Sequence, residues 1–368
     1  MKLLNCTLNE AEKCFGQKKI IFFGRGSWLG MVDYTNLMKF RKQFAYIIDN
    51  NCGGQEQLGD AVLDVYKPEK LKSEYECIVI LVSPVYMYEM YCQLEHMQLS
   101  DEIECYAFPF MQMVTSNKTD DILLNKVINR EEKAKIPKII HGFWFSGDKK
   151  PEAYQKCVDT WKRNLPEYEI IEWNMDNYDW HKHPFVERAI ELKAWAFASD
   201  FARLDVLYNY GGIYLDMDVE VFKSFDDLLG NEALFSFGNN VLIDLAVVGS
   251  KKHNQIIRHL LEKYDSIPLP QERKDYVGLF QPALVRPILA SQGIRMDGSL
   301  QIIDGATIFP SEFFMPQDVV LYRDYERTEH TYCVHYDNFG WSFDVNNKNE
   351  KKRHDNNLLW SMIEESAI

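Results

Sequence analysis

The sequence contains no run of about 18 apolar residues, the shortest length for a helix that spans a membrane. Its N-terminus reaches polar residues too early to form the apolar core of a secretory signal peptide. These absences argue against a membrane-embedded or exported protein. We therefore expect a cytoplasmic protein, and we leave open a peripheral association with the inner face of the membrane.

The eight cysteines form no CxxC pair and have no histidine cluster beside them. Zinc modules and disulfide scaffolds usually show such spacing, so neither is expected. The formal net charge of -14 argues against a nucleic-acid partner, because phosphate backbones are normally bound by a basic surface. A nucleotide is not excluded, since a metal ion and a basic side chain can neutralise its phosphates.

What the chain does have is length and apolar material. Its 368 residues are 46% hydrophobic and 14% aromatic, which is enough for two domains with their own cores. Residues 1–115 alternate strand-like and helix-like stretches, with strands expected at 19–23, 45–50 and 77–83. This alternation is typical of a parallel, doubly wound α/β unit, and it predicts a Rossmann-like domain over residues 1–115.

A glycine-rich turn from Gly24 to Gly30 (GRGSWLG) follows the first of these strands, and Asp49 closes the next. In dinucleotide-binding folds such a turn approaches phosphates and such an acid binds a ribose. The spacing here is GxGxxxG, however, where the usual motif is GxGxxG. Two interpretations stay open: a nucleotide site, or a structural or docking domain with a tight turn.

The polar and charged segment 116–135 predicts a helical linker, and a second domain is expected over residues 136–368. The patterns in this domain predict a short strand after Pro137, a helix around 152–163, a strand at 168–173, a helix from Phe185 to Tyr210 that stops at Gly211-Gly212, and a strand at 213–222.

The strongest chemical signal is the pair Asp216 and Asp218, which flanks Met217 after an apolar strand. Alternate residues of a strand project to the same side, so we expect the two carboxylates to converge. Two adjacent carboxylates must share a proton or a cation. A hard ion such as Mn²⁺ or Mg²⁺ that carries a diphosphate meets this demand, whereas solvated acids on an edge strand are the simpler alternative.

Asp200 and Arg203 lie one turn apart in the helical segment that leads into this strand. As a site, Asp200 would accept hydrogen bonds from sugar or ribose hydroxyls while Arg203 fixes Asp200 and the donor. The alternative is an ordinary ion pair on a helix surface. Because the helix runs through the double glycine into the acidic strand, we expect both pairs to face one cavity.

The run ASDFARLDVLYNYGGIYLDMDVEVF at 198–222 resembles the signature of the DxD-containing sugar-transferase family. That family includes capsular polysaccharide transferases and fungal α-1,6-mannosyltransferases, and the catalytic domain of the large clostridial glucosylating toxins has the same pattern. The resemblance extends to IPKIIHGFWFSG at 136–147 and to the segment 157–173. It implies a GT-A fold and a retaining transfer from a nucleoside-diphosphate sugar.

The resemblance also implies catalytic and metal-binding roles. Asp200 and Arg203 match residues that contact the donor sugar. Asp216 matches the acid that faces the ribose and sugar or shares the metal shell, and Asp218 matches the direct metal ligand. The family does not usually show a carboxylate nucleophile, so none is assigned.

Four further residues are assigned to substrate binding through the same resemblance. Trp144 matches an aromatic residue that stacks on the nucleobase, and Phe143 is placed beside it. Tyr214 and Asp244 are placed facing the donor, Asp244 because related chains have polar, sugar-facing residues there. Core packing is the alternative for the aromatic residues.

Near the C-terminus the family often carries a His followed by Ser-Trp, which contributes to the metal or the diphosphate. This chain keeps His335 and Trp341, which we assign to the metal and to substrate binding. Gly340 stands where the family has serine, so Asp337 and Asn338 are considered as substitute ligands.

Taken together, these features predict a metal-dependent retaining glycosyltransferase that uses Mn²⁺ or Mg²⁺ and a donor such as a UDP-sugar. The expected acceptor is a glycan or lipid-linked glycan, in the synthesis of a surface or capsular polysaccharide. One alternative is an NAD-dependent sugar-nucleotide oxidoreductase or epimerase that uses the glycine-rich turn. The other is an inactive carbohydrate-binding scaffold, although such a protein need not keep both metal carboxylates.

Overall fold

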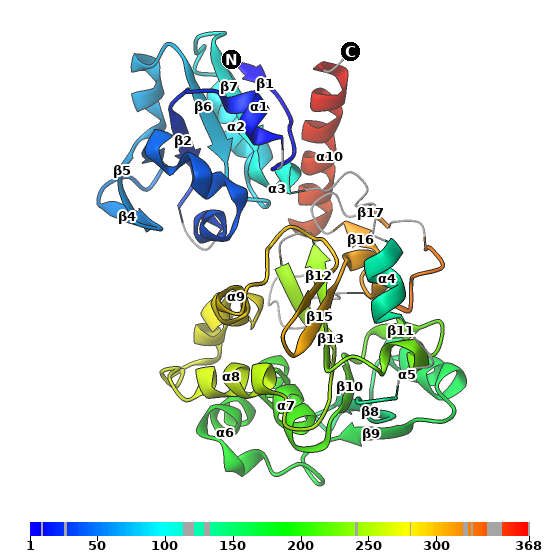
Figure 1. The fold of residues 1–368 in the computed structure, drawn as a ribbon. Helices are drawn as coiled ribbons and strands as arrows, with labels where there is room; N and C mark the ends of the chain where they lie inside the picture. Colours follow the sequence, from blue (N-terminus) through cyan, green and yellow to red (C-terminus); the bar gives the residue numbers. More distant parts are fainter. Residues whose placement is uncertain are drawn as a thin grey trace.

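The structure is a computed structural model with two large β-sheets, one above the other in Figure 1. It describes residues 1–8, 10–25, 28–112, 121–128, 133–239, 242–279, 281–318, 323–324, 327–336 and 348–366. The expected mixed α/β architecture is confirmed. Of the predicted linker 116–135, the described part contains helix α4 (Asp121–Val127).

The first sheet is parallel except at one edge. Its strands lie in the order β1-β7-β6-β2-β3-β5-β4, and only β4 runs antiparallel to its neighbour β5. The predicted strands are confirmed as β2, β3 and β6, whereas the β4–β5 hairpin was not predicted. In sheet order the bounds are β1 Lys2–Leu3, β7 Ile103–Ala107, β6 Cys77–Leu81, β2 Ile20–Phe23, β3 Phe44–Ile48, β5 Ala61–Tyr66 and β4 Gln55–Leu58.

Both faces of this sheet are covered, which explains why its central strands are continuously apolar. In β2, Ile20 and Phe22 enter one buried cluster and Ile21 and Phe23 enter the other. The first cluster lies under α1 (Ala11–Phe15) and the 3-10 helices η1 (Leu29–Tyr34) and η2 (Asn36–Gln43). The helix-like stretch expected between the first two strands thus consists of two short 3-10 helices.

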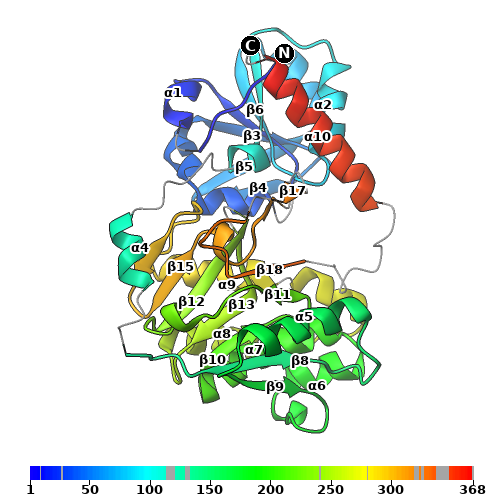
Figure 2. The ribbon, with the colours of Figure 1, turned by 90° about the vertical axis from the view of Figure 1, so that its right-hand side faces the viewer.

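The other face lies under α2 (Met87–Glu95) and, from the far end of the chain, α10 (Lys348–Ser366). Leu359 and Ile363 of α10 are buried in this cluster, and Trp360 packs edge-on against Phe110 of α3 (Phe108–Met111). Figure 2 shows α10 crossing the first sheet beside α2. The last helix of the sequence therefore completes the core of the N-terminal sheet. The remaining helix of this half is η3 (Pro68–Ser73).

The second sheet is mixed, in the order β14-β15-β12-β13-β10-β8-β9. Its centre combines a parallel pair, β8–β10, with an antiparallel pair, β10–β13. Its bounds are β14 Gln301–Ile303, β15 Ala306–Phe309, β12 Ala233–Asn239, β13 Leu242–Ser250, β10 Gly212–Leu215, β8 Ile139–Phe143 and β9 Glu169–Trp173. The strands predicted after Pro137 and at 168–173 are confirmed as β8 and β9.

Helices cover both faces of the second sheet as well. One cluster contains residues of α6 to α9, and the other contains Val158 and Trp161 of α5. The helix predicted from Phe185 to Tyr210 is in fact two, α6 and α7, separated at Lys193, whose positive φ (54°) is incompatible with a continuous helix. The bounds are α5 Glu152–Asn164, η4 Trp180–Lys182, α6 Pro184–Glu191, α7 Trp195–Tyr210, η5 Asp226–Leu228, α8 Gln255–Tyr264, η6 Arg273–Leu279, α9 Gln281–Ser291 and η7 Ser311–Phe313.

Two small antiparallel pairs complete the described structure: β11 (Val219–Val221) with β18 (Cys333–His335), and β16 (Gln317–Asp318) with β17 (Arg323–Asp324). The first of these pairs matters for the site, because it brings a C-terminal strand to the end of β10. No helix within the described residues combines the length and the apolar character needed to cross a membrane.

Candidate active site

Asp216 and Asp218 lie in a turn between β10 and β11, so the predicted strand over 213–222 is interrupted at the acids. The backbone N–H of Asp216 donates to the carbonyl of Ala246 on β13 (2.8 Å), and the N–H of Val219 closes the turn on the carbonyl of Asp216 (3.0 Å). The carboxylates therefore converge because the chain turns here, and the expectation that they alternate along a strand was wrong.

The double glycine at the start of β10 is required by close packing. Gly212 has φ 111°, and an added Cβ would lie 2.6 Å from the carbonyl oxygen of Ile139. Burial lowers the pKa of the neighbouring His141 to about 4, so its ring is neutral. Its Nδ1 accepts from Trp173 (3.0 Å) while Nε2 donates to the carbonyl of Gly211 (2.7 Å). These contacts fix the path of the chain into the acidic turn.

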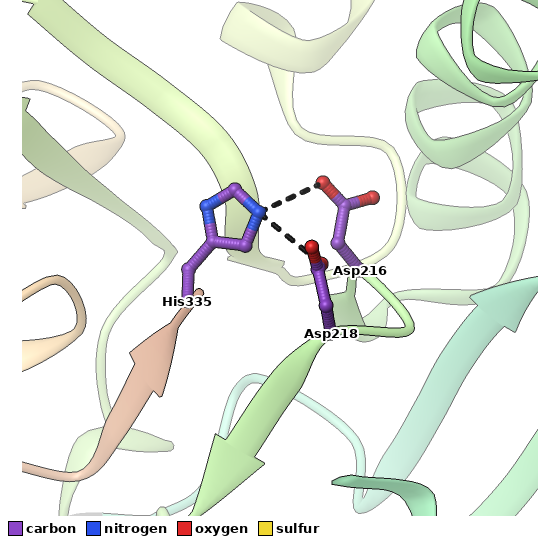
Figure 3. Close-up of side chains that lie close together, drawn as sticks. All are labelled: Asp216, Asp218 and His335. Carbon is purple, nitrogen blue, oxygen red and sulfur yellow. Dashed lines mark ion pairs between the residues drawn. The ribbon is translucent and has the colours of Figure 1, made fainter. Parts of the chain in front are cut away.

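His335 joins the two acids through the pairing of β11 with β18, in which Val219 lies opposite His335. Its Nε2 lies 3.2 Å from Oδ1 of Asp218 and 3.9 Å from Oδ2 of Asp216, as Figure 3 shows. Burial lowers the pKa of the imidazole, but the carboxylates of Asp218, Asp244 and Asp216 outweigh it and raise the pKa to about 10. The site thus has a strong preference for a positive charge between its acids.

Arg203, on helix α7, belongs to the same site. Its Nη2 lies 2.9 Å from Asp200 and 3.3 Å from Asp216, and its Nη1 donates to the carbonyl of Leu245 (2.8 Å). The guanidinium also stacks over the ring of Tyr214 (4.5 Å), whose hydroxyl donates to Asp216. Asp200 and Arg203 are therefore not an exposed helix pair, since Arg203 is buried and Asp200 is only partly exposed.

Burial has a direct effect on the two acids of this network. It raises the pKa of Asp200 to about 7, against the opposing charge of Arg203. The pKa of Asp216 is raised for the same reason, with Arg203 and His335 acting in the opposite direction. The cluster therefore contains carboxylates whose ionised form depends on a nearby cation.

These residues line one cavity of about 350 Å³. Its walls come from β8, α5, α7, β10, β13, α9 and β18. Of the residues predicted for the site, the cavity brings together Phe143, Trp144, Asp200, Arg203, Tyr214, Asp216, Asp218, Asp244 and His335. Trp341, Asp337, Asn338 and Gly340 lie outside the described residues.

Trp144 is held in a defined orientation at this cavity. Its indole Nε1 donates to the carbonyl of Asp148 (2.6 Å), and its ring meets Tyr154 of α5 edge-on at 5.8 Å. Phe143, in contrast, is buried among Phe145, Trp173 and Tyr178. Of the two aromatic residues, Trp144 is the more accessible for stacking on a ligand.

Sequence reasoning missed several cavity residues, among them Tyr154, Trp195, Gln281 and Pro282. Gln281 is buried and donates from Nε2 to the carbonyl of Asp200 (2.6 Å) and to the hydroxyl of Tyr264 (2.8 Å). It therefore links α9 to α7, the helix that carries Asp200. No motif marks these positions. Their proximity depends on how α5 and α9 pack on the sheet.

The donor set at the acidic turn suits a divalent cation. Ligand atoms of Asp216, Asp218 and His335 all lie within 4.8 Å of one another. Two carboxylate oxygens suit Mg²⁺ or Mn²⁺, and the imidazole nitrogen favours the softer transition metal. A cation there would also take the place of the proton that the three carboxylates otherwise hold on His335.

The sequence comparisons agree with the resemblance predicted from the motif. Residues 151–235 match the family described as "Glycosyltransferase sugar-binding region containing DXD motif", a segment that contains Asp200, Arg203, Asp216 and Asp218. Trp144, Asp244 and His335 lie outside the matched segment.

Curated relatives include two proteins of Schizosaccharomyces pombe (strain 972 / ATCC 24843). Inositol phosphoceramide mannosyltransferase 3 is 32% identical over 152 residues, which are 36% of this chain and 39% of that protein. Inositol phosphoceramide mannosyltransferase 2 is 28% identical over 225 residues, which are 56% of this chain and 58% of that protein. The chain thus spans less than two thirds of the length of these relatives.

Among solved structures, "PaToxG Glycosyltransferase" matches with a TM-score of 0.37 and 20% sequence identity, over 46% of this chain and 75% of that one.

Proposed function

We propose that this protein, whose residues 151–235 match the DXD-containing sugar-binding region of glycosyltransferases, is a metal-dependent glycosyltransferase. It would move a sugar from a nucleoside-diphosphate sugar, such as a UDP-sugar, to a glycan or lipid-linked glycan. We further propose that the transfer retains the anomeric configuration, as the resemblance implies.

The observation that carries this proposal is the convergence of three kinds of group on one cavity. Asp216, Asp218 and His335 would form a cation site, Asp200 and Arg203 form an adjacent polar pair, and Trp144 supplies an aromatic wall. A nucleoside-diphosphate sugar presents the matching groups: a diphosphate, hydroxyls and a planar base. The cavity volume of about 350 Å³ is within the usual range of small-molecule sites.

Each group has a role that follows from its chemistry. A divalent cation held by Asp216, Asp218 and His335 would neutralise the charge that develops on the leaving diphosphate. Ionised Asp200 would accept hydrogen bonds from sugar hydroxyls, and Arg203 orients Asp200 and Asp216 by bridging their carboxylates. Because Arg203 and His335 are buried and the acids are only partly exposed, the electrostatic effect of these groups on a bound donor exceeds what it would be in water.

The architecture supports two further proposals about the fold. The parallel strands β7-β6-β2-β3-β5 support a Rossmann-like assignment for residues 1–115. The mixed second sheet with its acidic turn supports a GT-A assignment for residues 136–368. Residues 116–135 would link them. Helix α10 belongs to residues 136–368 by sequence but packs on the first sheet. The two units would therefore be connected twice, by residues 116–135 and by the segment that leads to α10.

The acceptor is a separate proposal. Two relatives are named as inositol phosphoceramide mannosyltransferases, and these names support a lipid-linked acceptor at least as well as the surface or capsular polysaccharide expected from the sequence. We propose cytoplasmic action with peripheral contact to the membrane that carries such an acceptor.

Donor hydrolysis by the purified protein tests this function. UDP-, GDP- and CDP-sugars would each be incubated with Mn²⁺, with Mg²⁺ and with EDTA, and release of the nucleoside diphosphate would be measured. We expect metal-dependent release from one donor class, and no release by an Asp218→Ala variant with the same thermal unfolding profile. Absence of turnover and of binding for every donor, with folded protein, would contradict the proposal.

A further inference from the structure

The two ring nitrogens of His335 face different parts of the structure, one the acidic turn and the other strand β13. Nε2 faces Asp216 and Asp218, whereas Nδ1 lies 3.9 Å from Oδ2 of Asp244 on β13. Nδ1 is buried, and within the described residues it makes no hydrogen bond. The ring is therefore placed between the two acids of the turn and a third acid behind it.

Asp244 is itself held in place by the strands around it. Its Oδ1 accepts from the backbone N–H of Ala246 (2.6 Å), which leaves Oδ2 directed toward His335. Across the hairpin, Gly238 on β12 makes room for this side chain, since a Cβ there would lie 2.8 Å from Cβ and 3.2 Å from Oδ2 of Asp244. Asp244 therefore has little freedom to turn away from the ring.

A histidine that binds a metal through Nε2 must be neutral and must carry its remaining proton on Nδ1. Such rings usually donate that proton to a carboxylate or carbonyl, which fixes the tautomer and the ring orientation. The 3.9 Å separation is too long for a hydrogen bond, but an approach of about 1 Å would close it. Among the residues that the structure describes, the charged groups paired with His335 are Asp216, Asp218 and Asp244, and of these only Asp244 is near Nδ1.

We propose that Asp244 is a positioning residue for the metal site, which accepts the Nδ1 proton of His335 and thereby aims Nε2 at the cation. This assignment rests on the proposed function, because it requires that the site binds a divalent cation. It differs from the substrate-facing role that the sequence predicts for Asp244. A direct contact with the donor sugar would affect donor binding, whereas a positioning role affects the cation first.

The test measures Mn²⁺ binding to the full chain without any donor, by calorimetry and by the electron paramagnetic resonance signal of free Mn²⁺. Asp244→Ala should weaken Mn²⁺ binding roughly 10- to 100-fold, the usual effect of losing a carboxylate behind a ligating histidine. Asp244→Asn keeps the shape and the oxygen that receives the Ala246 N–H, but it presents an NH2 group to Nδ1, which cannot accept the proton of His335. It should therefore weaken Mn²⁺ binding about as much as Asp244→Ala. Because Asn can still receive the Ala246 N–H, it also serves if Asp244→Ala fails to fold.

Glu220→Gln is the matched control for charge. Glu220 lies on β11 two residues after Asp218, and its carboxylate accepts from the hydroxyl of Tyr336 and does not contact His335. The variant removes one negative charge near the site and keeps a side chain that can receive the Tyr336 hydroxyl. Mn²⁺ binding should change by less than about fivefold, because a partly exposed charge that does not contact the site contributes little.

The second readout is donor hydrolysis at increasing Mn²⁺. Saturating Mn²⁺ should restore most of the turnover of Asp244→Asn if Asp244 acts through the cation. Unchanged Mn²⁺ affinity with a raised KM for the donor would overturn the proposal and place Asp244 on the substrate. Unchanged Mn²⁺ affinity and unchanged KM would overturn it as well. A wild-type protein that binds no Mn²⁺ would instead refute the proposed function itself.

Discussion

Asp49 and Asp216 each directly follow a strand with a parallel neighbour, yet their carboxylates have different kinds of partner. In the N-terminal sheet, Oδ2 of Asp49 accepts from the backbone N–H of Arg25 (3.0 Å) and Oδ1 accepts from that of Asn51 (2.8 Å). In the second sheet, Asp216 faces Arg203 and His335 at a cavity. An acid after a strand thus indicates a ligand site only where the local backbone has not already engaged it.

The residues around Asp49 strengthen this contrast. The guanidinium of Arg25 donates to the carbonyls of Asn51 and Gly53 and pairs with Glu56, so the described part of the turn is closed by its own side chains. The chain then enters the short 3-10 helix η1, which does not provide the long helix N-terminus that a dinucleotide site uses. These contacts favour the structural interpretation of the glycine-rich turn.

The largest effect that this comparison predicts is for Asp218→Ala. Loss of a direct ligand should lower kcat/KM for donor hydrolysis by more than the roughly 100-fold typical of residues behind a ligand. The fold should be retained, because the side chain lies at a cavity and its removal opens no gap in a core. Steady-state kinetics with a circular dichroism melt would measure both, and substantial residual turnover in folded protein would remove Asp218 from the metal site.

The next effect concerns the aromatic wall. Trp144→Ala should weaken nucleoside-diphosphate binding roughly 5- to 150-fold, since stacking on a base contributes about 1–3 kcal/mol. Trp28 is the matched control, because it lies within the glycine-rich turn and packs against the N-terminal core. Trp28→Ala should lower the melting temperature without weakening nucleotide binding in calorimetry. A reversal of these two results would place the nucleotide in the N-terminal sheet.

The pH dependence should show a smaller effect through Asp200. Burial raises the pKa of Asp200 to about 7, so the ionised, hydrogen-bond-accepting form increases as pH rises through about 7. Activity should rise over that interval, and Asp200→Asn should lose this rise.

The same raised pKa affects the stability of the fold. The stability that it contributes is fully present at a pH below the pKa of the unfolded carboxyl group, and it is lost as the pH rises toward 7. Asp200→Asn should therefore gain stability relative to wild type from pH 4 to 7. Thermal melts across this range would check the sign.

The smallest effect is expected for Asp49→Ala. Two backbone N–H groups lose their carboxylate acceptor, which should cost about 1 kcal/mol of unfolding free energy in urea. Donor hydrolysis should stay unchanged. A large loss of turnover in folded Asp49→Ala protein would mean that the N-terminal turn contributes to the donor site after all.

The sequence allowed prediction of the features that depend on short-range pattern. Continuous apolar runs identified β2, β3 and β6, and the spacing of Asp200, Arg203, Asp216 and Asp218 indicated residues that do meet at one cavity. The break between α6 and α7 could not be foreseen, because Lys193 adopts a positive φ with no glycine or proline to mark it. The turn at Asp216 to Asp218 was missed for a similar reason, since its residues suit a strand equally well.

The long-range features were beyond the sequence. The pairing of β11 with β18 places His335 against residues more than a hundred positions earlier, and the packing of α10 on the first sheet joins the two ends of the chain. Both depend on tertiary packing. The resemblance to the family indicated His335 but not the strand pairing that places it, and no motif indicated the position of α10. The same holds for Gln281 and Tyr154, which reach the cavity only through the helices that carry them.

The most direct test of this account is a crystal structure of the protein with Mn²⁺ and UDP, with the metal located from its anomalous scattering. We expect one strong peak within coordination distance of Asp216, Asp218 and His335, with the diphosphate on its open side and Trp144 beside the base. A peak elsewhere, or nucleotide bound at the glycine-rich turn near Asp49 with the acidic turn empty, would contradict the assignment of the active site.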